Sequence, residues 1–197
     1  MRWATWATTR HGHPEARRSR VTYPMAMTSA DPDAPVTAAD VHVVRATVQD
    51  AEGIHRLVNY WASQGQMLPR TLGETYENLR DFFVVREGDR VVGCGALHIV
   101  WADMAELKSL AVEESEHSRG LGAAITRACV EEGRALGLTG LFALTYRPGF
   151  FERLGWRQAD VMTLPRKVWN ECYRCPKFPG CDEIAMVIDL APGQAAS

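Results

Sequence analysis

The stretch that decides the fold of this chain is residues 106–136, ELKSLAVEESEHSRGLGAAITRACVEEGRAL. Its first part, residues 106–112, is compact and rich in apolar residues, which indicates a buried strand. From Gly120 onward the apolar residues recur at helical spacing, so the pattern predicts a helix that continues to Leu136. The segment between them is then a loop that ends at a helix N-terminus.

The predicted helix begins almost without side-chain bulk, because residues 119–124 read Arg-Gly-Leu-Gly-Ala-Ala. The first N–H groups of a helix have no intrahelical acceptor, and the helix dipole adds partial positive charge at this end. A pyrophosphate can therefore bind there. The stretch lacks both the Gly-Lys-Ser/Thr of ATP-binding loops and the further spaced glycine of dinucleotide-binding loops, so ATP and NAD are disfavoured as ligands.

Two short motifs in this stretch, Leu110-Ala-Val112 and His117-Ser-Arg-Gly-Leu-Gly122, resemble motif A of the GNAT acetyltransferase superfamily. In that motif a strand ends in Leu-Ala-Val, and Gln/Arg-x-x-Gly-x-Gly/Ala follows after a loop; His117 replaces the Gln or Arg. The resemblance implies that a main-chain N–H near Leu110 holds the thioester oxygen of acetyl-CoA and that the helix start binds its pyrophosphate. The cofactor-binding residues that it implies are Leu110, Ala111, Val112, His117, Ser118, Arg119, Gly120, Leu121, Gly122 and Ala123.

Composition indicates one compact domain. The chain has 197 residues, 46% of them hydrophobic, and a formal net charge of -2, which suits a single substantial core. It carries no basic excess that would favour a nucleic-acid partner. The longest apolar run, residues 91–101, is interrupted by Gly93, Gly95 and His98 and is too short to span a bilayer. We expect a soluble protein without nucleic-acid or membrane partners, with His98 and Trp101 packed as strand residues.

The ends of the chain differ from its centre. Residues 1–38 are rich in Arg and poor in acidic residues, but no apolar face repeats through them and no secretory apolar segment is present. We expect a disordered N-terminal extension, with a transit peptide as the alternative. The GNAT domain is then expected over residues 39–191, in the cytoplasm, followed by a flexible tail at 192–197.

Periodicity divides the centre of the chain into strands and helices. The predicted strands are 41–45, 82–86, 91–100, 105–112, 141–145 and 184–190; helices are predicted to begin near residues 47–50, 71, 120 and 150. The second helix has the capping-box spacing Thr71-Leu-Gly-Glu74 and is expected to carry Leu72, Tyr76 and Leu79 on one face. The predicted fold class is α/β (α+β), a mixed central sheet with helices on both faces, in the element order of a GNAT fold.

Several longer segments carry a closer resemblance. They are Met67-Leu-Pro-Arg70, Val92-Gly-Cys-Gly-Ala-Leu97, Ala105-Glu-Leu-Lys-Ser-Leu-Ala-Val112, Leu144-Thr145 with Phe150-Phe-Glu-Arg-Leu-Gly155, and Leu164-Pro-Arg-Lys-Val-Trp169 through Cys181-Asp-Glu-Ile-Ala-Met186. These resemble the short, stand-alone N-acetylglutamate synthases, which lack the amino-acid-kinase-like domain of the longer ones. The resemblance implies direct transfer of acetyl from acetyl-CoA to the α-amino group of L-glutamate, the first step of arginine biosynthesis.

Acetyl transfer to an amine needs a neutral amine, a stabilised oxyanion and a proton for the departing thiolate. Glu106 and Lys108 share one face of a strand that is otherwise rich in apolar residues, where charge is costly unless it is paired or used. The residues alone favour a plain surface ion pair between them. The resemblance instead implies that Glu106 is the catalytic base, directly or through a water.

The acceptor needs cations, because a dicarboxylic amino acid calls for at least two fixed positive groups. The resemblance assigns this task to Lys108 and Arg70, although the sequence alone equally favours a solvated loop arginine at position 70. Further substrate-binding candidates are Ser109, Arg147, Arg166 and Lys167.

The proton donor for the thiolate has two candidates, Thr145 and Tyr146. Many GNAT enzymes use a Tyr where this chain has Phe151, which has no proton to give. The resemblance favours Thr145, whereas Tyr146 suits the chemistry better, because a phenol pKa of about 10 lies nearer that of a thiol. Strand alternation points the two side chains to opposite faces, so normally only one reaches the sulfur. Protonation by solvent stays open as a third route.

Cysteines near the C-terminus, Cys172, Cys175 and Cys181, form a C-x2-C-x5-C pattern. A zinc site needs a fourth ligand, and no His lies nearby in the sequence. We therefore expect reduced thiols and no metal cofactor, with a zinc site completed by Asp182 or an outside group as the alternative.

Other functions stay open. The acceptor can be glutamine, a drug or a protein amine in place of glutamate, and a homodimer is compatible with the resemblance. A non-catalytic acyl-CoA sensor is the alternative from another class, because His117 and Phe151 depart from the catalytic pattern.

Overall fold

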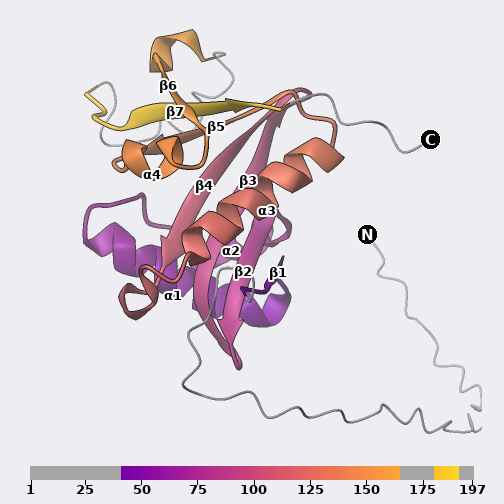
Figure 1. Cartoon of the computed structure of the whole chain (residues 1–197). Helices are drawn as coiled ribbons and strands as arrows, with labels where there is room; N and C mark the ends of the chain where they lie inside the picture. The colour runs from indigo at the N-terminus through magenta and orange to yellow at the C-terminus, as the bar shows by residue number, and fades with distance from the viewer. Residues whose placement is uncertain (1–40, 165–179, 191–197) are drawn as a thin grey trace, which may run out of the picture. The chain divides into compact units, whose positions relative to one another are not determined.

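A single sheet organises the part of the chain that the structure describes, residues 41–164 and 180–190 of a computed structural model (Figure 1). Its strands lie in the order β1-β2-β3-β4-β5-β7-β6. They are β1 Val43–Arg45, β2 Phe82–Glu87, β3 Arg90–Trp101, β4 Met104–Val112, β5 Gly140–Thr145, β6 Arg157–Ala159 and β7 Ile184–Asp189. The helices are α1 Ala51–Ser63, α2 Leu72–Glu77, α3 Leu121–Ala135 and α4 Pro148–Glu152, with short 3-10 turns at Val48–Asp50, Leu79–Asp81, Glu114–Glu116 and Val161–Thr163.

The sheet is mixed. Every neighbouring pair of strands is antiparallel except β4 and β5, which are parallel and are connected through α3. Two parallel strands need a crossover connection of this kind, because a tight turn reverses the chain and so joins only antiparallel strands. Strand β5 therefore runs parallel to β4, and the predicted mixed sheet is confirmed.

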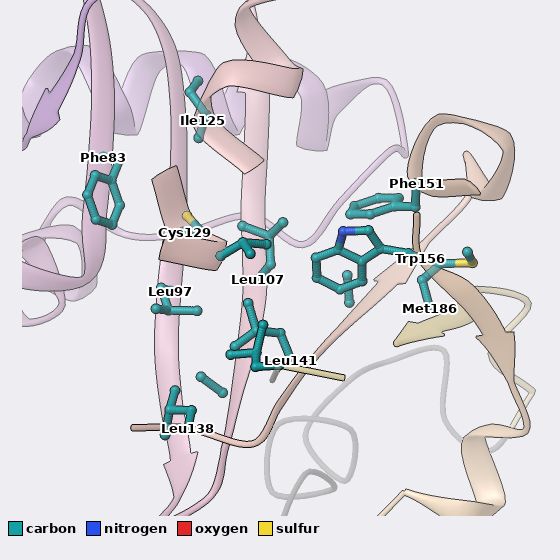
Figure 2. Packing of buried hydrophobic residues seen from close by; sticks show 14 of the residues in the cluster. Phe83, Leu97, Leu107, Ile125, Cys129, Leu138, Leu141, Phe151, Trp156 and Met186 are labelled. Carbon is teal, nitrogen blue, oxygen red and sulfur yellow. The ribbon is translucent and has the colours of Figure 1, made fainter. Parts of the chain in front are cut away.

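Helices cover both faces of the sheet, as predicted. On one face α1 buries Ile54 in a cluster with Val84 of β2. On the other, Ile125 and Cys129 of α3 pack with Leu107 of β4 (Figure 2). Burying one such aliphatic side chain stabilises the fold by about 1.5–3 kcal/mol. The sheet is thus fixed from both sides, which holds the ends of β4 and β5 in place.

The second predicted helix is correct at its start and wrong at its end. Thr71 and Glu74 form the capping box: the Glu74 N–H donates to Thr71 Oγ1 at 3.1 Å, and the Thr71 N–H donates to the Glu74 carboxylate at 2.7 Å. The helix stops at Glu77, because the amide groups of Asn78 close it by donating to the Glu74 carbonyl. Leu79 lies in a separate 3-10 turn rather than on the same helix face.

Two further differences concern short elements. The helix predicted at residues 150–154 begins at Pro148, since the fixed φ of proline suits the first helical position. Strand β6 was not predicted, because three residues are too few to display alternation; it pairs with β7 at the edge of the sheet.

The two residues expected to pack within β3 behave differently. Trp101 is 54% exposed, because it pairs with Met104 at the end of the β3–β4 hairpin. His98 is partly buried and its Nδ1 lies 2.6 Å from Asp81 Oδ2. Neither is a plain core residue. The predictions for residues 1–38 and 192–197 lie outside the described residues.

Candidate active site

Strands β4 and β5 separate in the middle of the sheet. They pair only from Met104 to Glu106, although β5 continues to Thr145 while still pairing with β7. The cause lies in β4, where Ser109 has a φ of 53° and two residues, Ser109 and Leu110, lie opposite Gly95. Such a bulge bends a strand away from its neighbour. The backbone groups of β4 beyond Glu106 are thereby released from β5.

Gly95 permits this bulge. A Cβ at position 95 would lie 2.7 Å from a methyl group of Ile125 and 3.2 Å from Leu110 Cδ1. Any side chain there would therefore push α3 or the bulge aside. The separation of the strands is thus fixed by packing from the neighbouring strand and helix.

A cavity of about 700 Å³ opens where the strands separate. It is lined by β4, the loop after it, the start of α3, the end of β5 and α4. Most of the predicted site residues line it: Lys108, Ser109, Leu110, Ala111, Val112, His117, Ser118, Gly120, Leu121, Gly122, Ala123, Thr145, Tyr146 and Arg147. Three predicted site residues, Glu106, Arg70 and Arg119, do not line it.

The start of α3 offers main-chain donors to the cavity. Gly120 is the N-cap, with a φ of 78° that glycine adopts without a Cβ penalty. The first regular helical bond runs from the Ala124 N–H to the Gly120 carbonyl at 3.0 Å. The N–H groups of Leu121, Gly122 and Ala123 precede this bond, so they have no intrahelical acceptor. Together with the helix dipole they form a site suited to a phosphate group.

Arg119 lies just before this helix, but its guanidinium pairs with two carboxylates and does not line the cavity. Its guanidinium donates to Glu87 at 2.6 Å and to Glu116. These two carboxylates raise the pKa of Arg119 above its ordinary value, with Glu87 as the larger cause. The side chain therefore braces the loop against the β2–β3 hairpin.

His117 and Trp61 form a stacked pair at the wall of the cavity. Their ring centroids lie 5.5 Å apart with an interplanar angle of 12°. Trp61 Nε1–H also donates to the Val112 carbonyl at 2.9 Å, so one polar group of the released part of β4 is already bonded. This role of Trp61 was not predicted, because helical spacing shows which face of α1 is buried but not what that face adjoins.

Glu106 and Lys108 lie at the point of separation. Glu106 is the last residue of β4 paired to β5, opposite Phe142, and on its other side it lies opposite His98. Lys108 is two residues further along the same face and lines the cavity. The charged pair expected from the sequence thus adjoins the released backbone of β4.

The two candidate proton donors have different partners. The Arg147 N–H donates to Thr145 Oγ1 at 3.0 Å, so the Thr145 hydroxyl accepts and its own proton stays available to a second group. The Tyr146 hydroxyl donates to Asp182 Oδ1 at 3.0 Å. The phenolic proton is therefore held by a carboxylate.

Arg70 lies on the loop between α1 and α2, where Asn59 grips its backbone. Asn59 Nδ2 donates to the Arg70 carbonyl at 2.7 Å, and the Arg70 N–H donates to Asn59 Oδ1 at 3.2 Å. The position of the arginine is thus fixed from α1.

Some cavity residues were missed. Gln66 and Met67 line it from the loop after α1, and Met67 is the first residue of the Met67-Leu-Pro-Arg70 segment noted in the sequence. Arg153 and Phe150 line it from the region of α4, and Glu183 from just before β7. Phe150, Arg153 and Glu183 also lie in segments that carry the resemblance, but no role was assigned to them there, and only folding brings these residues to one cavity.

The described side chains offer no metal site. Within residues 41–164 and 180–190, no group of three or more His, Cys, Asp or Glu side chains is arranged to hold a metal ion. Cys181 is exposed, with its Sγ 3.6 Å from Glu183 Oε2. Cys172, Cys175, Arg166 and Lys167 lie outside the described residues. Among the described helices, none is both long and apolar enough to cross a lipid bilayer.

Similar sequences come from bacteria. An uncharacterized N-acetyltransferase of Chlorobaculum tepidum is 39% identical over 157 residues, which covers 78% of this chain and 99% of that protein. An amino-acid acetyltransferase of Mycobacterium tuberculosis is 33% identical over 135 residues, covering 67% of this chain and 77% of that protein.

Solved structures show the same fold. Rv2747 from Mycobacterium tuberculosis, in complex with CoA and NLQ, superposes with a TM-score of 0.67 at 28% identity, covering 76% of this chain and 99% of that one. N-acetylglutamate synthase from Neisseria gonorrhoeae, complexed with coenzyme A and N-acetyl-glutamate, gives a TM-score of 0.69 at 25% identity. That superposition covers 77% of this chain and 35% of the synthase chain. Residues 51–156, from the start of α1 to the end of the α4 region, match the acetyltransferase (GNAT) family. The mixed sheet, the separated strands and these relatives agree, and the chain belongs to the GNAT family of acetyltransferases.

Proposed function

We propose that this enzyme is an amino-acid N-acetyltransferase that transfers the acetyl group of acetyl-CoA directly to the α-amino group of L-glutamate. The transfer takes place in a ternary complex and is the first step of arginine biosynthesis, in the cytoplasm. The observation that carries this proposal is the single cavity that joins the start of α3 to Lys108 and Arg147. One end suits an anionic cofactor and the other suits an anionic acceptor.

Acetyl-CoA is the acyl donor. The family membership supports this, and two structural relatives were solved with CoA bound. The pyrophosphate binds the main-chain N–H groups of Leu121, Gly122 and Ala123. The pantetheine arm follows the part of β4 that β5 has left, next to Ala111, and the N–H of Leu110 holds the thioester oxygen. Such a donor stabilises the oxyanion that forms as the amine attacks.

Glutamate fits the charges of the cavity. Lys108 and Arg147 both line it, and each can form a charge-assisted hydrogen bond to one carboxylate of a dicarboxylic acceptor. Arg70, on a loop held by Asn59, is a third cation near the end of α1. The relatives named amino-acid acetyltransferase support an amino-acid acceptor.

Glu106 removes the proton from the substrate ammonium, directly or through a water. Its place at the last β4–β5 pair, next to the cavity residues Leu107 and Lys108, supports this role. Glu106 lies on the same strand as Leu110, where the thioester is expected, so a water can connect the carboxylate to the amine. The neutral amine then attacks the thioester carbon.

Thr145 gives the proton to the departing thiolate. Its oxygen accepts from the Arg147 N–H, which leaves its own proton to donate and stabilises the negative charge that develops on the oxygen. Tyr146 is disfavoured, because its proton already bonds to Asp182. The hydrogen-bond pattern therefore supports the choice between the two hydroxyls.

An acceptor panel tests the proposal. Release of free CoA thiol is followed with glutamate, glutamine and aspartate at saturating acetyl-CoA. We expect the highest kcat/KM for glutamate, about 10-fold above glutamine, because one charge-assisted hydrogen bond is lost with the amide. Higher kcat/KM for glutamine would reassign the acceptor. Tight acetyl-CoA binding without turnover of any amine would contradict an enzymatic function and favour a sensor.

A further inference from the structure

His98 of β3 lies between two carboxylates. Its Nδ1 is 2.6 Å from Asp81 Oδ2, at the end of the 3-10 turn that precedes β2. On the other side it is directly opposite Glu106 of β4. Directly opposite residues of antiparallel strands share a face, with Cβ atoms about 4.5–5.5 Å apart. Asp81, His98 and Glu106 therefore form a row across one face of the sheet.

This row separates two apolar clusters on the same face. Ala96, two residues before His98, belongs to the cluster beneath α1, and Phe142, opposite Glu106, belongs to the cluster around β5 and β7. A row of charged groups across such a face is costly unless it is paired or used. At its inner end Glu106 is followed directly by the cavity residues Leu107 and Lys108. At its outer end the row reaches solvent, because the His98 side chain is 33% exposed.

The pairing with Asp81 fixes the chemistry of the ring. When His98 is neutral, Asp81 holds the proton on Nδ1, so Nε2 carries the free lone pair. When Nε2 takes up a proton, the Asp81 carboxylate stabilises the imidazolium without becoming protonated itself. His98 is thus arranged to accept a proton at one defined atom. The described charged groups on its face are Asp81, Glu106 and, one pair further along β4, Lys108.

We propose that His98, oriented by Asp81, receives the proton that Glu106 takes from the substrate ammonium and passes it to solvent. The proposal rests on the proposed function, in which Glu106 is the base. The ammonium N–H bond breaks as the Glu106 O–H bond forms; that bond then breaks as Nε2–H forms, and the imidazolium loses this proton to water. Glu106 is thereby reset as a carboxylate for the next turnover. His98 acts through Glu106 and is a positioning residue.

The kinetic test uses His98→Ala, with His42→Ala, an exposed residue beside β1, as the matched control. We expect His98→Ala to lower kcat about 100-fold, with the KM for glutamate changed less than about threefold. Added imidazole restores kcat, because the free base takes the place of the ring. His42→Ala keeps the original kcat. Unchanged kcat in His98→Ala, or a folded variant that imidazole does not restore, overturns the proposal.

A second measurement does not depend on activity. NMR of the 15N-labelled full chain follows the His98 ring nitrogens with pH in the wild type, Asp81→Asn and Glu106→Gln. Removal of either carboxylate changes the signals of the ring nitrogens, because each carboxylate neighbours the ring. If Glu106→Gln leaves the His98 signals unchanged, the two residues are not coupled and the inference fails. If the ring is coupled but the wild type acetylates no amino acid, the proposed function fails instead.

Discussion

The proposed cofactor side and the proposed acceptor side of the cavity are built from different parts of the chain. On the cofactor side the groups are mainly main-chain atoms: the N–H groups at the start of α3 and the released edge of β4. On the acceptor side they are charged side chains, Lys108 and Arg147, with Glu106 at the strand separation. A main-chain site depends on backbone geometry, whereas a side-chain site depends on residue identity.

The two sides are therefore expected to respond to different kinds of substitution. Changes of charge on the acceptor side are expected to alter the chemistry and the affinity for glutamate while leaving acetyl-CoA affinity intact. On the cofactor side, added bulk rather than altered charge is expected to matter, because the donors belong to the backbone.

The largest effect is expected for Glu106→Gln. Without the base, kcat/KM for glutamate falls about 10²- to 10⁴-fold below neutral pH, where most of the amine is protonated. The dissociation constant of acetyl-CoA stays the same. Glu131→Gln, at an exposed residue of α3, is the matched control and keeps full activity. An unchanged rate below neutral pH in Glu106→Gln would remove this carboxylate from the mechanism.

Lys108→Met is expected to raise the KM for glutamate about 100-fold, because one substrate carboxylate loses a charge-assisted hydrogen bond of about 1.5–3 kcal/mol. Methionine keeps the length of the side chain and removes only the charge. Isothermal titration with acetyl-CoA should give the wild-type affinity. Equal weakening of both ligands would contradict the separation between the two sides.

Asp50→Asn tests a charge that is expected to contribute to the stability of the fold but not to catalysis. Asp50 is buried and receives two hydrogen bonds of 2.6 Å from Arg86, as well as the Thr47 N–H. The hydrogen bonds from Arg86, the largest cause, lower the pKa of Asp50 to about 2 from 3.8. The carboxylate therefore stabilises the fold fully above pH 3.8 and loses this contribution as pH falls through 2.

At pH 7 we expect Asp50→Asn to lower the free energy of unfolding by about 2 kcal/mol, while kcat at 25 °C is unchanged. Urea unfolding at pH 7 and pH 2 measures the difference, which should shrink at the lower pH. Asp189→Asn, whose exposed pair with Arg157 contributes little, is the control. A difference that stays the same at both pH values would show that the charge of Asp50 is not the cause.

Gly122→Val is expected to raise the dissociation constant of acetyl-CoA about 10-fold, because the side chain occupies space next to the phosphate donors. The nearest atoms to an added Cβ are those of the Phe150 ring at 3.5 Å, so the fold should tolerate the change. Gly73→Val in α2, where the nearest atom is 3.9 Å away, serves as the control. Wild-type affinity in Gly122→Val would place the pyrophosphate elsewhere.

The smallest effect concerns the proton donor. Thr145→Val should lower kcat severalfold to about 10-fold, since water can replace the hydroxyl in part. Tyr146→Phe should change kcat less than twofold, because its proton bonds to Asp182. Steady-state kinetics with both variants decides between them. The opposite order would make Tyr146 the donor.

The cofactor side was readable from the sequence because its signals are local. The change of period at Gly120 and the side-chain-poor start of α3 lie within one continuous stretch, and both are as predicted. Arg119 was harder, because its partner Glu87 is distant in the sequence and is brought close only by the β2–β3 hairpin. No local pattern indicates that its charge is engaged there.

The geometry of the separation was predictable only in part. The resemblance implied a thioester site near Leu110, but the bulge at Ser109 that releases this part of β4 depends on Gly95 in the neighbouring strand. The pairing of His98 with Asp81 likewise arises from contact between a strand and a turn that the sequence keeps apart. Contacts of this kind follow from sheet register, which alternation within one segment does not define.

A crystal structure of the full chain with acetyl-CoA tests the central claim most directly. We expect the pyrophosphate oxygens within hydrogen-bond distance of the N–H groups of Leu121, Gly122 and Ala123, and the thioester between β4 and β5 next to Leu110. A nucleotide bound away from the start of α3, or β4 and β5 paired along their whole length, would contradict the account.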